Sequence, residues 1–268
     1  MLRARMRKKE RHQLILQELQ IRPHVRVATL AQRFDVATET IRRDLDALSA
    51  EGLIDREFGG ASARPMGHQP PAEERGQTII AERARIGAAA CAMILPGEVV
   101  MVDAGSTVSQ LARFLRPGAQ PRTFITNCYS VVRNMGDQAR SDHVILCPGR
   151  YDPQENAVYG TDTVEYLRRF QANKAFIGAS GLSRQGPSDV NRDAVWVKRA
   201  MMERSGEVWL MIDHTKFDQR FLEIVTPLDV LTGIISDQLP PPALLAQLDR
   251  SNVRVVVAEG QDSGLAAI

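Results

Sequence analysis

The hydrophobic pattern of the chain changes character near residue 60. Before that point, apolar positions recur at helical spacing in three short segments, ERHQLILQELQ, VATLAQRFD and VATETIRRDLDALSAEGL. In the third segment Ile41, Leu45 and Leu48 would face a core, between charged neighbours. The stretch LIDREFGGAS follows, where Gly59 and Gly60 indicate the turn or exit of a small β-wing. Together these segments predict a winged helix–turn–helix domain over residues 1–60.

The second part of the chain has a different period. Residues 61–80 are rich in proline, glycine and polar side chains, which predicts a linker. Beyond them we expect strands at 98–103, 123–126, 143–147, 174–179, 207–213, 231–237 and 253–258. Helices fit between them at 81–95, 161–171, 192–204 and 241–249, and also in TVSQLARFL. This alternation favours a mostly parallel, doubly wound α/β domain over residues 81–268.

Composition narrows the class of protein. The 268 residues are 44% hydrophobic and 25% charged, which is sufficient for a core without disulfides or structural metals. The three cysteines, Cys91, Cys128 and Cys147, are too widely spaced for a disulfide framework or a metal site and indicate reduced thiols in the cytoplasm. We expect no secretory signal, no membrane span, no cofactor and no metal.

Positive charge is concentrated at the front of the chain. Residues 1–64 contain 13 Lys and Arg against 9 Asp and Glu, whereas the net charge of the whole chain is only +2. A basic front end favours a polyanionic partner, although a solvated terminus would have the same composition. The third helix would present four side chains to DNA, those of Thr38, Thr40, Arg42 and Arg43. The wing would add Arg56, Gly59 and Gly60. Asp44 and Asp46 are expected on a solvated face or in ion pairs that orient a neighbouring arginine. A helix–turn–helix that binds protein, or no partner, is the alternative.

One spacing is more specific than composition. Arg11, Ile15 and Leu19, followed after seventeen residues by ATETIRRDL, resemble the DNA-binding signature of the DeoR family of bacterial transcription regulators. GLIDREFGGAS resembles that family's wing, with Phe58 where histidine is common. Ala37 stands where a capping serine is usual, so we expect Thr38 to cap the helix instead and to shift its start by one residue. The resemblance implies an operator-binding regulator, and operator symmetry implies a homodimer or homotetramer.

The ends of the predicted parallel strands carry polar groups. After the first strand, the turn DAGST offers Asp103, Gly105, Ser106 and Thr107, whose amides and hydroxyls could hold a phosphate. Ligands of such sheets bind outside the carboxyl ends of the strands, where further strands end in Thr126, Asn127, Gly149, Arg150, Asp213 and Lys216. Each of these could instead be a turn, a helix cap or solvated surface. Taken together they predict a site for a small anionic ligand.

The rear domain also resembles the DeoR family's sensor. The matching runs are VDAGSTV, ITN, NKAFIGASGL, VKRAMMERS and IDHTKF. That sensor is similar in fold to ribose-5-phosphate isomerase and glucosamine-6-phosphate deaminase, which implies a phosphorylated sugar or polyol as effector. The isomerases carry a run of acids where this chain has IGASGL, and proton transfer needs such a carboxylate. We therefore predict a repressor that binds the sugar without converting it.

Other interpretations of the rear domain remain open. One is an isomerase or deaminase fused to a DNA-binding domain, and another is an architectural DNA binder without a ligand. Asp189 and Asp193 could contact sugar hydroxyls, or they could simply be solvated loop residues. His214 is expected to be structural, because no second metal ligand lies at a suitable spacing.

Overall fold

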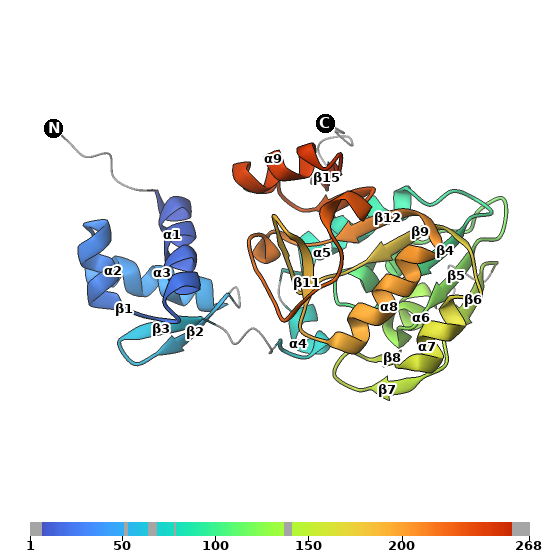
Figure 1. Ribbon diagram of the computed structural model, residues 1–268, viewed down its shortest axis with the longest axis horizontal. Helices are drawn as coiled ribbons and strands as arrows, with labels where there is room; N and C mark the ends of the chain where they lie inside the picture. Colours follow the sequence, from blue (N-terminus) through green and yellow to red (C-terminus); the bar gives the residue numbers. More distant parts are fainter. Residues whose placement is uncertain (1–6, 51–52, 64–68, 78, 137–140, 259–268) are drawn as a thin grey trace. The chain divides into compact units, whose positions relative to one another are not determined.

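A computed structural model describes residues 7–50, 53–63, 69–77, 79–136 and 141–258. The chain divides into two compact units between residues 68 and 69 (Figure 1). Their hydrophobic cores share no residue. None of the described helices combines the length and the apolar composition that a membrane crossing requires.

The N-terminal unit contains three helices and a three-stranded antiparallel sheet of order β1-β3-β2. Its elements are α1 (Lys8–Ile21), β1 (His24–Arg26), α2 (Val27–Phe34), α3 (Thr38–Ala50), β2 (Ile54–Glu57) and β3 (Gly60–Ala63). The prediction of the apolar face of α3 is confirmed, because Ile41, Leu45 and Leu48 are fully buried. They pack with Ile15 of α1 and Leu30 of α2 in one core.

A buried ion pair ties the first helix to the third. Arg11 donates from Nε to Asp44 Oδ2 at 2.6 Å and from Nη2 to Oδ1 at 3.0 Å. His12 Nε2 lies 3.2 Å from the same carboxylate. The side chain of Asp44 is only 3% exposed, so of the two expected roles the ion pair with an arginine is present and the solvated face is not. Sequence periodicity could not reveal a partner 33 residues away.

The start of α3 differs from the expected one. The carbonyl of Ala37 accepts from Thr40 N at 3.0 Å and from Ile41 N at 3.3 Å, so Ala37 occupies the N-cap position. Thr38 is the first helical residue, and the predicted shift to a Thr38 cap does not occur. Val36 packs against the core just before the helix, and Ile41 is fully buried in the same core.

The wing is a tight hairpin paired with a third strand. β2 and β3 are joined by Phe58 and Gly59, and Gly59 has a φ of +77° that glycine adopts at least cost. β1, which the sequence did not predict, pairs with β3 so closely that a Cβ on Gly60 would lie 2.1 Å from the carbonyl oxygen of Val25. The sheet thus continues to residue 63, beyond the expected boundary at 60.

The expected linker over residues 61–80 is partly structured. β3 occupies its beginning, a short helix α4 (Ala72–Gly76) lies near its middle, and α5 (Ile80–Ala92) starts at its end. The positions 64–68 and 78 lie outside the described residues.

The C-terminal unit is built on a seven-stranded parallel sheet of order β15-β14-β12-β9-β4-β5-β6. Every strand predicted from the sequence is present: β4 (Val99–Val102), β5 (Thr123–Thr126), β6 (His143–Leu146), β9 (Ala172–Ile177), β12 (Ser205–Met211), β14 (Gly233–Ser236) and β15 (Arg254–Val257). Three small antiparallel strands form a side sheet of order β10-β11-β13, and two more form a hairpin. These short strands were not predicted: β7 (Arg150–Asp152), β8 (Ala157–Tyr159), β10 (Gly181–Ser183), β11 (Gly186–Asp189) and β13 (Glu223–Ile224).

The connections place helices on both faces of the sheet. The further helices are η1 (Val108–Phe114), α6 (Tyr129–Met135), α7 (Thr161–Leu167), α8 (Arg192–Glu203) and α9 (Pro242–Arg250), with two short 3-10 helices, η3 (His214–Lys216) and η4 (Leu228–Val230). The chain runs from β4 through β5 to β6, returns to β9 beside β4, and continues through β12 to the other edge. Right-handed crossovers in these two opposite directions put η1 and α6 on one face and α8 and α9 on the other. α5 packs on η1, and α7 packs on α8. Figure 1 shows α7 and α8 on the same side of the sheet.

This winding order creates a switch point between β4 and β9, where the chain leaves the sheet in opposite directions. A crevice opens at the carboxyl ends of such strands. The loops after β4, β9 and β12 therefore surround the place where a ligand of this fold would bind.

Candidate functional site

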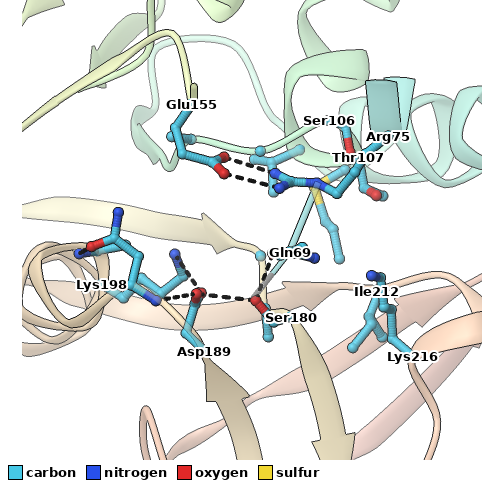
Figure 2. A pocket seen from close by; sticks show the side chains of 18 of the residues that line it. Gln69, Arg75, Ser106, Thr107, Glu155, Ser180, Asp189, Lys198, Ile212 and Lys216 are labelled. Carbon is cyan, nitrogen blue, oxygen red and sulfur yellow. Dashed lines mark hydrogen bonds and ion pairs between the residues drawn. The ribbon is translucent and has the colours of Figure 1, made fainter. Parts of the chain in front are cut away.

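A pocket lies at this switch point (Figure 2). It encloses about 540 Å³, counting the open mouth. Its walls come from the loops that follow β4, β9 and β12, from β11 and α8, and from the segment around α4 and α5. The side chains and backbone at its wall are therefore supplied by parts of the chain that are more than a hundred residues apart.

The loop after β4 supplies small and hydroxylated residues. Gly105, Ser106 and Thr107 line the pocket, and Gly105 has a φ of +146° that favours glycine. The backbone of the loop turns back when Ser109 N donates to Gly105 O at 3.0 Å. The predicted helix after this loop is a 3-10 helix of seven residues, so hydroxyls and local amides are better anion donors here than a long helix dipole.

A buried cation forms the base of the pocket. Lys198 Nζ lies 3.0 Å from Asp103 Oδ2 and 3.3 Å from Asp189 Oδ2, and its side chain is only 3% exposed. Burial alone would lower the pKa of Lys198, but the two carboxylates raise it above its ordinary value. Burial raises the pKa of Asp103, although Lys198 opposes that shift. One cation thus holds two carboxylates, and it stays protonated at neutral pH.

Ser180 extends this cluster toward the mouth of the pocket. Its Oγ lies 3.1 Å from Asp189 Oδ1 and 2.8 Å from Gln69 Oε1 (Figure 2). Asp189 Oδ1 also accepts from Asn191 N at 3.2 Å. Hydroxyl, amide and carboxylate groups at this spacing match the hydrogen-bonding pattern of a polyhydroxylated ligand.

Two further ion pairs line the opposite wall. Arg75 donates to both carboxylate oxygens of Glu155, at 2.9 and 2.7 Å. Arg83 donates to Asp213 Oδ2 at 3.1 Å, and both side chains are almost completely buried. Lys216 lines the pocket as well. Each wall carboxylate named here, Glu155 and Asp213, therefore faces a guanidinium group.

The structure places six of the ten residues predicted for the ligand site at the pocket. Gly105, Ser106, Thr107, Asp213 and Lys216 line the pocket, and Asp103 lies beneath it. Four others lie elsewhere: Thr126, Asn127, Gly149 and Arg150. They remain predictions as ligand contacts, and the local structure gives each of them a different role.

Those four residues have partners within the fold. Thr126 Oγ1 donates to Val102 O at 2.6 Å, and Asn127 Nδ2 donates to Val158 O at 3.0 Å, and both residues are fully buried. A Cβ on Gly149 would meet Thr163 Oγ1 at 2.2 Å. Arg150 pairs with Asp193 on the exposed surface at 2.6 Å.

Several lining residues were not predicted from the sequence. They are Gln69, Arg75, Arg83, Glu155 and Lys198. Lys198 interrupts the apolar face of VWVKRAMM, and a lysine at that position could have indicated a buried charge. Arg83 likewise lies on the buried face of a predicted helix, three residues before Ile86. The other three stand in polar stretches with no periodicity, and only the fold brings them to the pocket.

The second candidate site is the exposed side of α3. The side chains of Arg42 and Arg43 are 58% and 79% exposed, and each has a nitrogen 3.4 Å from Glu39. Thr38 is exposed and Thr40 is half-buried beside them. Together they form a polar, cationic face of the size that fits a DNA groove.

The wing residues divide into a support and a tip. Arg56 donates to Asp46 Oδ1 at 2.9 Å and to Gly60 O at 2.5 Å, so it fastens the wing to α3. Gly60 is buried against β1, whereas Gly59 and Phe58 are exposed at the tip. The three predicted wing residues thus lie in one hairpin, where Arg56 and Gly59 are exposed and Gly60 is buried.

A winged helix–turn–helix unit joined to an α/β unit with a polar pocket defines a ligand-controlled DNA-binding regulator. Residues 11–64 match the DeoR-like helix-turn-helix domain, and residues 79–238 match the DeoR C terminal sensor domain. The chain belongs to the DeoR family of transcription regulators.

Relatives match along nearly the whole chain. The HTH-type transcriptional repressor GlcR of Bacillus subtilis is 30% identical over 248 residues, which cover 91% of this chain and 94% of that protein. The glycerol-3-phosphate regulon repressor of Escherichia coli is 26% identical over 252 residues, which cover 93% of this chain and 99% of that protein.

Among solved structures, ribose 5-phosphate isomerase A of Methanocaldococcus jannaschii matches with 12% identity and a TM-score of 0.37, over 50% of this chain and 52% of that one.

Proposed function

We propose that this protein represses an operon for sugar or polyol catabolism and that a phosphorylated sugar or polyol controls it. The N-terminal unit binds operator DNA in the cytoplasm, and the pocket of the C-terminal unit binds the effector. The names of the two relatives, one a repressor of a glycerol-3-phosphate regulon, support this assignment.

The observation that carries the DNA-binding proposal is the exposed face of α3. Arg42 and Arg43 project from a helix whose opposite side is fixed by Ile41, Leu45 and the Arg11–Asp44 pair. A rigid helix with exposed arginines can position guanidinium groups against phosphates and guanine edges. Thr38 and Thr40 add hydroxyl and methyl contacts, and the wing, with Arg56, Gly59 and Gly60, lies beside them in the same unit.

The first prediction concerns these two arginines. In the Arg42→Ala, Arg43→Ala variant we expect loss of specific operator binding with an unchanged fold, and a salt dependence flatter by about one unit for each lost phosphate contact. Fluorescence anisotropy on DNA from upstream of the gene measures the affinity, and circular dichroism checks the fold. The matched control is Arg113→Ala, Arg250→Ala, which removes the same charge from exposed sensor positions. Equal affinity in both variants would disprove the assignment.

The effector proposal is supported by the pocket at the switch point. Gly105, Ser106 and Thr107 offer amide and hydroxyl donors to a phosphate, and Lys216 adds a positive charge. Ser180, Asp189 and Asn191 offer partners for sugar hydroxyls. The same anisotropy measurement, repeated with glycerol 3-phosphate, ribose 5-phosphate and glucose 6-phosphate, tests this part. An operator affinity that no phosphate ester changes would contradict it.

We propose binding without turnover. The run Ile177–Leu182 contains no acid, and although three carboxylates reach the pocket from other segments, each is held by a cation: Glu155 by Arg75, Asp189 by Lys198 and Asp213 by Arg83. A carboxylate committed to such a pair is poorly placed to take a proton from carbon. Isomerisation of ribose 5-phosphate by the purified protein would favour the enzyme alternative instead.

We also propose that the active species is a homodimer or homotetramer. Operator half-sites related by two-fold symmetry are matched by symmetric proteins. Sedimentation of the protein with and without a palindromic operator tests the stoichiometry, and a single chain on each operator would contradict it.

A further inference from the structure

The polar wall of the pocket includes residues from the segment that directly follows the DNA-binding unit in sequence. Gln69 is the first residue of the C-terminal unit, and Arg75 lies on the short helix α4. Both line the pocket, and both are held by groups that line it too. The segment Gln69–Gln77, named here the connecting segment, is therefore part of the ligand site.

The contacts of the connecting segment converge on the pocket. Gln69 Oε1 lies 2.8 Å from Ser180 Oγ, and Arg75 makes the two-pronged ion pair with Glu155 (Figure 2). The Nη1 atom of Arg75 also donates to Pro70 O at 2.7 Å, so the same side chain fixes the backbone at the start of the segment. Ala72 N donates to Gln154 O at 2.8 Å beside Glu155.

The buried pair of Arg83 and Asp213 supports this arrangement from below. Arg83 donates through Nη1 to the backbone carbonyl of Arg75 and through Nε to Asp213. The position of α4 thus depends on groups at the carboxyl end of β12. One guanidinium group thus links the end of β12 to the backbone of the connecting segment.

We infer that the connecting segment couples the pocket to the DNA-binding unit, because the effector's phosphate competes with Glu155 for Arg75 and its hydroxyls compete with Gln69 for Ser180. Coupling requires that the free and the effector-bound protein make different contacts. They do so here, because the effector binds the same side chains that Glu155 and Gln69 contact in the free protein. Arg75 is suited to this role, because a guanidinium group binds carboxylate and phosphate with the same two-pronged geometry. The inference rests on the proposed function and names the regulation of its site.

The first experiment removes the charge of Glu155, the group that competes with the phosphate for Arg75. Glu155→Gln retains the shape of the side chain but removes its charge, so Arg75 becomes available to a phosphate. The affinity of the full-length protein for ribose 5-phosphate, glycerol 3-phosphate and glucose 6-phosphate is measured by titration calorimetry. For the ester that binds the wild type, we expect Glu155→Gln to tighten binding by about fivefold or more, the lower end of the range for coupled sites. A purely structural ion pair would give unchanged or weaker binding, which would overturn the inference.

The second experiment removes the hydrogen bond between Gln69 and Ser180 at the start of the connecting segment. In Gln69→Ala we expect the ratio of operator affinities with and without the ester to fall toward one, from the roughly 5- to 150-fold typical of coupled sites. The matched control is Glu74→Gln, an exposed residue of α4 in the same connecting segment but outside the pocket, which should keep the wild-type ratio. A wild-type ratio in Gln69→Ala would overturn the inference.

A measurement on the wild type covers the case in which a variant fails to fold. Amide hydrogen exchange in Gln69–Gln77 should change when the ester binds, whereas exchange in the distant helix α9 should not. Unchanged exchange in the connecting segment would overturn the inference even if the ester changes operator affinity. A wild type that binds operator DNA but ignores every ester would instead contradict the proposed function.

Discussion

Lys198 is a residue at which burial and charge oppose one another. Its ammonium group is enclosed by the fold, and the structure compensates with Asp103 at 3.0 Å and Asp189 at 3.3 Å. Removing one partner from a buried ion pair leaves the other charge without compensation, which typically costs about 3–5 kcal/mol. We expect Lys198→Met to destabilise the C-terminal unit by about that amount, measured by urea unfolding.

The control for Lys198→Met also neutralises Asp103, one of the two carboxylates that lose their cation. Asp103→Asn combined with Lys198→Met should recover a measurable part of the lost stability, because one buried carboxylate is then neutral. A double variant less stable than Lys198→Met alone would show that Asp103 stabilises the fold independently of the lysine. Asp103 does accept from Gly178 N at 3.1 Å, which asparagine can preserve through its oxygen.

His214 and Asp237 form a hydrogen-bonded pair whose contribution to stability depends on pH. His214 Nδ1 lies 2.6 Å from Asp237 Oδ2, and His214 N donates to Oδ1 at 2.8 Å. Burial alone would raise the pKa of Asp237, but His214 holds it below its ordinary value of 3.8. Because the folded pKa is the lower one, the ionised carboxylate stabilises the fold above the unfolded value and this stabilisation is lost as the pH falls through the folded value.

The direction of this change of stability with pH can be tested with the variant Asp237→Asn. At about pH 7 the variant should be less stable than the wild type by about 1–3 kcal/mol, the usual cost of losing a buried charged acceptor. The gap should narrow as the pH falls below 3.8 toward the folded pKa, because Asp237 of the wild type then becomes protonated too. Thermal unfolding across this range measures it, and a gap independent of pH would disprove the role of the carboxylate.

At the scale of elements, the wing depends on two adjacent glycines for different reasons. Gly60 has no room for a side chain, because its Cβ would collide with the backbone of Val25, whereas Gly59 faces open space but has a positive φ. We expect Gly59→Ala to cost about 1–2 kcal/mol, the strain of a left-handed residue. Gly60→Ala should cost more, about 3 kcal/mol, since β1 and β3 must separate. Thermal unfolding of the two variants compares them directly, and equal costs would contradict the close packing.

The main elements could be predicted because their apolar pattern is strong. The seven parallel strands are continuous apolar runs, and α3 shows its core face at regular spacing. β1, β7, β8 and the small side sheet have only two to four residues each, too few for a period to appear. For the pocket, strand ends predicted Gly105, Ser106, Thr107, Asp213 and Lys216, since they are local signals. Gln69, Arg75 and Glu155 could not be predicted, because only the tertiary structure pairs residues 80 positions apart.

At the scale of the whole molecule, the two hydrophobic cores predict how the protein unfolds. The core of the N-terminal unit extends from Ile15 to Ala61, and that of the C-terminal unit from Ile86 to Ala258. Because no residue belongs to both, each unit should unfold in its own cooperative transition in calorimetry. A ligand stabilises only the unit that binds it, by about 2.7 kcal/mol at a hundred times its dissociation constant. We therefore expect a phosphate ester to raise the melting temperature of the larger transition and operator DNA to raise that of the smaller one.

The assignment of the two transitions can be made with variants already described. Lys198→Met should lower only the transition of the C-terminal unit, and Gly60→Ala only that of the N-terminal unit. If the connecting segment couples the units, adding the ester should also change how far operator DNA shifts the smaller transition, because linked equilibria are reciprocal. A single transition moved equally by both variants would mean that the two units unfold together, and the separate cores would then not act as separate folding units.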